Sequence, residues 1–225
     1  SSTVHGLICL VLLGAFLIKD GITFDEPNAR YHYIFIGFSF GYYLVDTIAS
    51  FLFGFGGAGM TAHHIIMILI LSYICIKSRY AGLFSYLMFL GEVSNPFMHI
   101  RKNMMQFENT KVYTDVLGII FCVTYIVCRV VLITMASQDI SDSTIALAFK
   151  LLISSVWYLS LYWSVAVAGL LFKGLSETYP NKLFKAVYDV LTFIESHKVT
   201  VVLKHVVLFA NAFSRYWNSK HIEYF

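Results

Sequence analysis

Long apolar runs separated by short polar stretches make up most of this chain of 225 residues. A helix needs about 20 mostly apolar residues to cross a membrane, whereas a membrane-spanning strand needs only about 10 residues of alternating character. The runs here do not alternate, and six of them meet or approach the helical length. They predict transmembrane helices over residues 3–18, 31–55, 63–76, 81–100, 115–135 and 145–172.

The pattern changes after Phe172. Residues 173–198 mix Lys, Glu, Asp and His with apolar residues, which is typical of an amphipathic helix at a membrane surface. Residues 199–213 are apolar again, but Lys204 and His205 lie in the middle of this short run, so a surface-lying or partner-packed helix is favoured over a seventh crossing. The sequence predicts two domains: a transmembrane domain over residues 1–172 and a partly apolar, amphipathic extension over residues 173–225.

Composition indicates the same class of protein. Hydrophobic residues make up 58% of the chain and charged residues only 13%, and the mean hydropathy is +0.72. In soluble domains about a quarter of the residues are charged. We therefore expect an all-α membrane protein. The net charge of +3 is spread along the chain without a cluster of Lys and Arg, which argues against nucleic acid as a partner.

Ionisable and amide side chains interrupt four of the apolar runs. Such groups are costly inside a membrane, and they mark functional sites by default. We expect the helices that carry them to enclose a polar cavity. The residues concerned are Asp46 in the second run, His63 and His64 at the start of the third, Glu92 and Asn95 in the fourth, and Arg129 in the fifth.

Histidine beside a carboxylate suits acid–base chemistry near neutral pH, because the carboxylate orients the ring and stabilises its cationic form. Candidate catalytic residues are therefore His63, His64, Asp46 and Glu92. Adjacent residues point about 100° apart on a helix, so only one of the two histidines can face a given cavity squarely. No spacing typical of a metal site, such as HExxH, occurs, and no metal is predicted.

Further side chains are candidates for binding a substrate. On a single helix over residues 81–100, Glu92, Asn95, Pro96 and His99 would share one face, which we expect to form the cavity wall opposite the histidines. The candidate substrate-binding residues are Asn95, His99, Arg129, Tyr42 and Trp157.

Structural roles are open alternatives for these residues. The histidine pair would serve as a cap that satisfies backbone groups at a helix end. Asp46 and Arg129 would form an ion pair that joins two helices, since an unpaired charge is unfavourable in lipid. Arg129 is in either case expected inside the bundle, with Asp46 or Glu92 as its partner. His5 and His99 are expected to make polar packing contacts.

A series of short motifs carries a resemblance to a known family. In order along the chain they are Ser2-Thr3-Val4-His5, Gly41-Tyr42-Tyr43 with Asp46, His63-His64, Glu92-Val93-Ser94-Asn95-Pro96-Phe97, and Arg129. Together they resemble the TLC domain, the multi-span lipid domain of ceramide synthases, of the translocon-associated TRAM proteins and of the ceroid-lipofuscinosis cargo receptor. The resemblance covers residues 1–172 and is nearest to the small proteins that consist of a TLC domain alone.

The resemblance to ceramide synthases is partial. Those enzymes have a Thr three positions after the second His, where this chain has Met67, and they carry two Asp in the segment that here contains Glu92 and Asn95. An amide cannot act as a base, so the resemblance implies a ceramide-synthase-like architecture more strongly than it implies acyl transfer.

We expect the protein to bind or remodel acyl lipids, of sphingolipid or phospholipid type, through its polar cavity. If it is an enzyme, an acyltransferase with acyl-CoA as co-substrate is expected, and no other cofactor. The alternative is a non-catalytic accessory subunit of a larger membrane assembly, such as one in the mitochondrial inner membrane, in which the C-terminal extension contacts partner proteins. The endoplasmic reticulum is the favoured location and the mitochondrial inner membrane the alternative.

Overall fold

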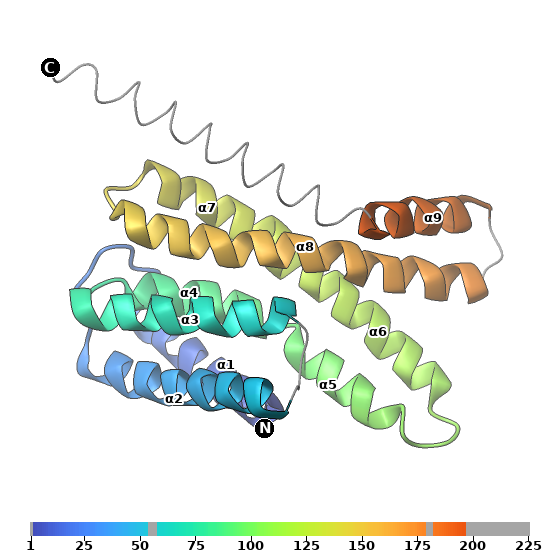
Figure 1. Cartoon of the computed structure of the whole chain (residues 1–225), viewed down its shortest axis with the longest axis horizontal. Coiled ribbons are helices and arrows are strands. Elements are labelled where there is room, and N and C mark those ends of the chain that lie inside the picture. The colour runs from blue at the N-terminus through green and yellow to red at the C-terminus, as the bar shows by residue number, and fades with distance from the viewer. Residues whose placement is uncertain (1, 54–57, 179–181, 197–225) are drawn as a thin grey trace, which may run out of the picture. The chain divides into compact units, whose positions relative to one another are not determined.

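The computed structural model describes residues 2–53, 58–178 and 182–196 (Figure 1). Within these ranges helices are the regular secondary structure, and a single isolated β-bridge joins Pro27 and Arg79. The helices are α1 (Ser2–Asp20), α2 (Arg30–Phe53), α3 (Ala58–Lys77), α4 (Ala81–Glu92), α5 (Asn95–Met104), α6 (Lys111–Tyr125), the π-helix η1 (Ile126–Leu132), α7 (Ile133–Asp142), α8 (Leu147–Thr178) and α9 (Lys182–Ser196).

Five helical stretches in the described part of the chain are long and apolar enough to cross a membrane. They are Thr3–Asp20, Arg30–Phe53, Gly59–Lys77, Lys111–Ile140 and Leu147–Glu177. Large apolar side chains on them, such as Ile34, Val45 and Phe51 of α2, are exposed and suited to contact lipid. These spans confirm the predicted class, an all-α integral membrane protein.

The remaining predicted span is interrupted. The prediction of one helix over residues 81–100 is wrong, because α4 ends at Glu92 and α5 begins at Asn95. Pro96 lies in the first turn of α5. A proline has no backbone N–H to donate, and its ring clashes with the preceding turn, so it favours the start of a helix over the interior. Broken helices are tolerated at membrane depth where protein surrounds them.

The third helix begins earlier than predicted. α3 starts at Ala58, five residues before His63. The Ala-Gly-Met-Thr-Ala segment, which follows a glycine-rich stretch, is part of the helix. The histidine pair is therefore inside the helix, beyond the first four N–H groups that lack an intrahelical partner. The alternative role of the pair as a helix cap is wrong.

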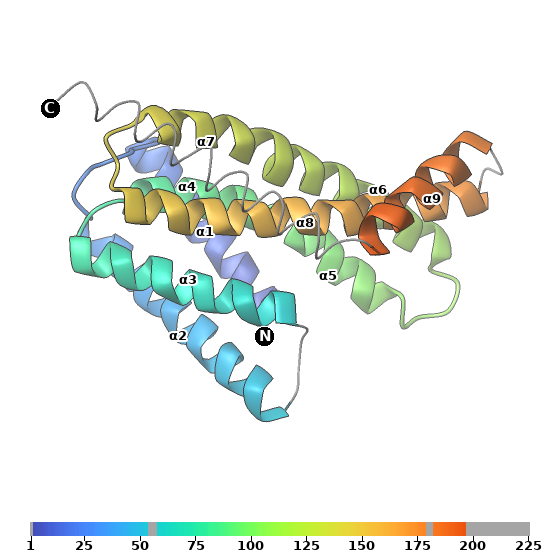
Figure 2. The same ribbon diagram turned by 45° about the horizontal axis from the view of Figure 1, so that its top comes forward.

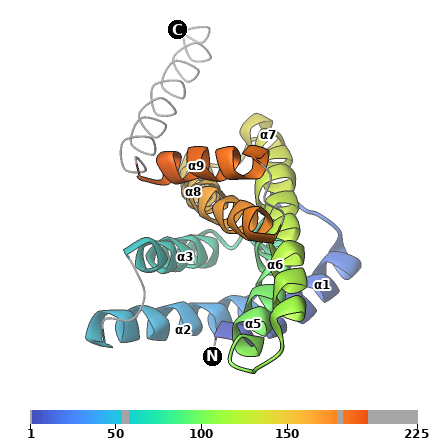
Figure 3. The ribbon, with the colours of Figure 1, turned by 90° about the vertical axis from the view of Figure 1, so that its right-hand side faces the viewer.

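Three pairs of helices pack most closely in the first part of the chain: α1 with α4, α2 with α3, and α5 with α6 (Figures 2 and 3). Between transmembrane helices, packing and polar contacts stabilise association, because lipid tails are as apolar as the side chains. The largest fully buried side chains include Leu13, Phe35, Ile70, Leu71, Leu83 and Phe149.

The connection between α1 and α2 holds the turn between α3 and α4. Asn28 donates its side-chain Nδ2 to the carbonyl of Ile74 over 3.2 Å, and its Oδ1 accepts from the backbone N–H of Ala81 over 3.0 Å. Beside it, Arg79 Nε lies 3.0 Å from Asp25 Oδ1. The turn needs this support, because Ser78 and Tyr80 have positive φ angles that are unfavourable for residues other than glycine.

The fifth span is one continuous helical stretch with a π-helical segment inside it. η1 covers Ile126–Leu132 and contains Arg129, whose side chain is only 9% exposed. π-helical turns are rare and occur frequently at functional sites.

The chain divides into two compact units, residues 1–167 and 168–225, which we describe separately. In the second unit α8 continues without a break through Phe172. α9 is amphipathic, since Val187 and Leu191 occupy one face and Lys185 and Asp189 the opposite face. An amphipathic helix is therefore present within the predicted range 173–198, over Lys182–Ser196, whereas residues 173–178 continue α8. The run over residues 199–213, with Lys204 and His205, lies outside the described residues.

Candidate functional site

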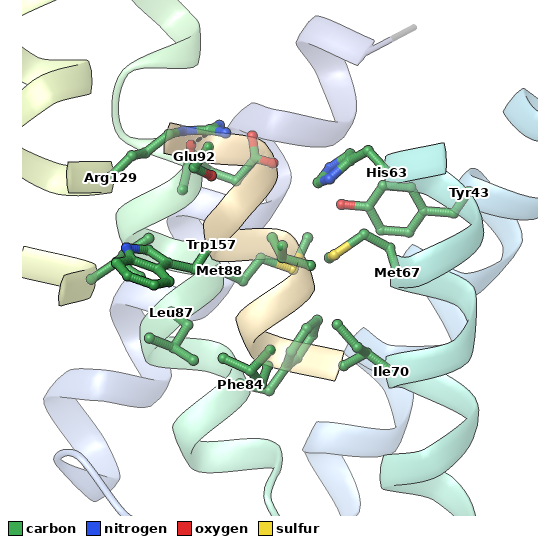
Figure 4. A pocket seen from close by; sticks show the side chains of 15 residues that line it. Tyr43, His63, Met67, Ile70, Phe84, Leu87, Met88, Glu92, Arg129 and Trp157 are labelled. Atoms are coloured by element: carbon green, nitrogen blue, oxygen red, sulfur yellow. Dashed lines mark hydrogen bonds between the residues drawn. The ribbon is translucent and has the colours of Figure 1, made fainter. Parts of the chain in front are cut away.

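Side chains from α2, α3, α4, η1, α7 and α8 line a cavity of about 60 Å³ in the first unit (Figure 4). Its two ends differ in character. Arg129, Glu92 and His63 lie at one end, and the hydroxyl of Tyr43 points inward near them. The apolar remainder is lined by Met67, Ile70, Phe84, Leu87 and Met88, among others.

A chain of hydrogen bonds forms the polar end. Arg129 donates from Nη2 to the carbonyl of Gly91 and, over 3.2 Å, to Oδ1 of Asn95. Asn95 in turn donates from Nδ2 to Oε2 of Glu92 over 2.8 Å. The guanidinium of Arg129 also lies 5.0 Å from the ring centroid of Tyr125, which suits a cation–π contact.

The chemistry of the partners fixes the direction of the Asn95 amide. An arginine side chain can only donate hydrogen bonds, so the amide oxygen has to face Arg129. The amide nitrogen then faces Glu92, whose carboxylate accepts. Asn95 thus connects the Arg129 guanidinium to the Glu92 carboxylate by one hydrogen bond at each end of its amide. An aspartate at this position could accept from Arg129 but could not donate to Glu92 while ionised.

Two buried nitrogen atoms at this end have no hydrogen-bond partner among the described residues. They are Nε of Arg129 and Nδ1 of His63. A buried polar group without a partner costs about 1–3 kcal/mol, so a native structure seldom leaves one without a water or ligand to bind.

The two adjacent histidines face different surroundings, as their angular separation on a helix predicts. His63 lines the cavity, and its ring lies 5.6 Å from that of Trp163. His64 is buried toward α2, where its Nδ1 lies 3.0 Å from Oδ2 of Asp46. This contact has the length of an ion pair without the alignment of a hydrogen bond.

The partner of Arg129 differs from one of the predictions. Asp46 lies beside His64, so the predicted ion pair between Asp46 and Arg129 is wrong. Arg129 is inside the bundle as expected, and it reaches the Glu92 carboxylate through Asn95. The interruption contributes to this arrangement, because it places the Gly91 carbonyl in the last turn of α4, where it accepts from Arg129.

The remaining predicted residues divide between the cavity and its surroundings. Trp157 lines the cavity and donates from Nε1 to Oγ1 of Thr134 over 3.2 Å. Tyr42 stacks on His5 with ring centroids 3.9 Å apart and does not line the cavity. His99 also lies away from the lining, because the break in the helix separates α5 from the face that carries Glu92.

A buried polar cluster beside the cavity joins α1 to α2. His5 Nε2 lies 3.3 Å from Oγ of Ser39 and 3.3 Å from Sγ of Cys9, and all three side chains are buried. His5 therefore makes the polar packing contacts that its sequence position predicts. A side chain on Gly6 would place its Cβ 2.9 Å from Oε2 of Glu92, so α1 approaches the polar end closely at this glycine.

Sequence reasoning missed several lining residues, although helical spacing contained the signal for them. Met67 and Ile70 follow His63 by four and seven positions and therefore share the face of α3 that carries His63. Met88 precedes Glu92 by four positions and therefore shares the face of α4 that carries Glu92.

A bundle of apolar helices around a polar cavity, with one helix interrupted at that cavity, defines the protein as a multi-span integral membrane protein. The sequence model of the TLC domain (TRAM/LAG1/CLN8) matches residues 1–172, and the chain belongs to this family, which is linked to lipid metabolism. Comparison with curated proteins and with solved structures gives no match.

Proposed function

We propose that the protein binds an acyl lipid at this cavity, with the lipid head at the polar end and only the first part of an acyl chain along the apolar wall, because a cavity of about 60 Å³ is too small for a whole lipid. The division of a single cavity into these two ends carries the proposal. Membership of a family linked to lipid metabolism supports it.

The buried nitrogen atoms supply a reason for affinity. Nε of Arg129 donates, and Nδ1 of His63 donates or accepts according to the tautomer. An oxygen atom of a lipid head would satisfy either nitrogen and remove the cost of about 1–3 kcal/mol that an unpaired buried group carries. The apolar wall adds binding through contact with the chain, since Met67 and Met88 have flexible side chains that adapt to irregular shapes.

The geometry favours binding over acyl transfer. A carboxylate that orients a histidine base assists acyl transfer. Of the two adjacent histidines, the one with a carboxylate neighbour is His64, beside Asp46, and neither residue lines the cavity. His63 does line it, but the carboxylate there, that of Glu92, bonds to Asn95. An acyltransferase with acyl-CoA as co-substrate, and an accessory subunit that docks through residues 173–225, remain predictions.

Lipid that copurifies with the protein tests the proposal. The protein is purified from membranes in mild detergent, and bound lipid is quantified by mass spectrometry. Met88→Trp fills the apolar wall and should reduce retained lipid by roughly tenfold, the change that about 1.4 kcal/mol gives. The matched control is Ile119→Trp, because Ile119 is 44% exposed on α6 and outside the cavity lining. The control should retain as much lipid as the wild type.

Overpacking a buried site costs about 1–3 kcal/mol in itself, so the melting temperature of each variant is recorded beside the lipid content. Equal amounts of lipid on folded Met88→Trp and on the wild type would show that the lipid binds elsewhere on the protein.

A further inference from the structure

The charges at the polar end of the cavity balance. Among the residues that line the cavity, one side chain is a permanent cation, Arg129, and one is an acid, Glu92. The Asn95 amide joins the two in a single hydrogen-bonded chain. Opposite charges held this close compensate each other, which is the arrangement that allows ionisable side chains to exist inside a membrane.

Part of the arginine is already engaged, and its charge faces an acid in the same cavity. Its Nη2 already donates to the carbonyl of Gly91 and to Asn95, and its electrostatic partner Glu92 faces the same cavity.

From this balance we infer that the lipid bound in the cavity has an uncharged head, which carries a hydroxyl group and a carbonyl oxygen and no phosphate. The inference rests on the proposed lipid binding and names the class of lipid. A phosphate would bring one to two further negative charges next to Glu92 in a medium of low dielectric constant, where like charges repel strongly.

An uncharged head matches the groups that the cavity offers. A carbonyl oxygen accepts from Nε of Arg129, which lacks a partner among the described residues. A hydroxyl group can donate to the Glu92 carboxylate, which accepts from Asn95 at Oε2 and retains further acceptor capacity. The hydroxyl of Tyr43 and Nδ1 of His63 complete a set that includes both donors and acceptors.

Two lipids that differ only in the phosphate test the inference. The purified full-length protein is stripped of lipid, incubated with equal amounts of 1-oleoyl monoacylglycerol and 1-oleoyl lysophosphatidic acid in mixed detergent micelles, repurified, and analysed by mass spectrometry. The wild type should retain the monoacylglycerol in an excess of roughly tenfold, the ratio that a difference of about 1.4 kcal/mol gives.

A variant that changes the charge balance provides a second measurement. Glu92→Gln keeps the size of the side chain and its acceptor for Asn95 but removes the negative charge, so Arg129 becomes uncompensated and the ratio should shift toward lysophosphatidic acid. Glu108→Gln makes the same chemical change at an exposed position away from the cavity and should leave the ratio of the wild type unchanged.

The outcomes separate the two proposals. Preferential retention of lysophosphatidic acid by the wild type, or equal retention of both lipids, overturns the uncharged-head inference and leaves lipid binding intact. Retention of neither lipid overturns lipid binding itself. If Glu92→Gln does not fold, the wild-type ratio still decides the inference.

Discussion

Arg129 donates a hydrogen bond from Nη2 to the backbone carbonyl of Gly91, one residue before α4 ends. Carbonyl groups in the last turn of a helix lack intrahelical partners, and inside a membrane water is not at hand to replace them. A side chain on the π-helical segment of another span supplies the donor. The two irregular elements of the bundle, the π-helix and the interrupted helix, thus meet in this one contact.

Replacing Arg129 by Leu should lower the yield of folded protein strongly. The substitution leaves the Gly91 carbonyl and Asn95 without their donor and leaves the charge of Glu92 uncompensated. Breaking a buried ionic arrangement by removing one member costs about 3–5 kcal/mol. Fluorescence-detected size-exclusion chromatography measures the folded fraction. Lys111→Leu is the control, since Lys111 is exposed at the start of α6, and its yield should equal that of the wild type.

Asn95→Asp should destabilise the protein by about 1–3 kcal/mol, because it puts a second carboxylate 2.8 Å from Glu92 in place of a donor. Adding Glu92→Gln to the same chain should restore stability, because the new amide at position 92 can donate to the new carboxylate at 95, which keeps Arg129 as its partner. Melting temperatures of the two single variants and the double variant form a double-mutant cycle. A double variant less stable than Asn95→Asp alone would contradict the assigned direction of these hydrogen bonds.

His64 and Asp46 should be energetically coupled, whereas His63 and Asp46 should not. The first pair is in contact over 3.0 Å, while His63 faces the cavity. Residues in contact show coupling energies of about 0.5–3 kcal/mol, and the coupling is weaker between residues that do not touch. Thermal unfolding of His64→Ala, Asp46→Ala and their combination gives the coupling, and the same cycle with His63→Ala is the control. Coupling of equal size in both cycles would refute the division of roles between the histidines.

Substitutions at Asn28 should have graded effects on stability. Asn28→Asp keeps the acceptor for the N–H of Ala81 but loses the donor to the carbonyl of Ile74, and Asn28→Ala loses both hydrogen bonds. Each hydrogen bond contributes about 1 kcal/mol to the free energy of unfolding, so Asn28→Ala should melt at a lower temperature than Asn28→Asp. Asn103→Ala, at an exposed position of α5, provides the baseline. Equal melting temperatures for Asn28→Ala and the wild type would show that the connection does not hold the α3–α4 turn.

The apolar runs by themselves determined the class of the protein and the location of most spans. Run length and composition suffice for this, because the membrane forces every backbone polar group into internal hydrogen bonds and so leaves helices as the structure for such runs. Within the same runs the sequence also identified Asp46, His63, Glu92 and Arg129 as candidate functional residues, because an ionisable residue is unusual among apolar neighbours.

The tertiary structure decided which of those residues meet. Asp46 lies beside His64 and away from Arg129, and Arg129 reaches Glu92 through Asn95. These pairings depend on how each helix is rotated and where the fourth one breaks, and a sequence pattern fixes neither rotation nor depth. In a membrane both faces of a helix are apolar, so hydrophobic periodicity, which orients helices in soluble proteins, gives little guidance, and packing against neighbouring helices sets the rotation instead.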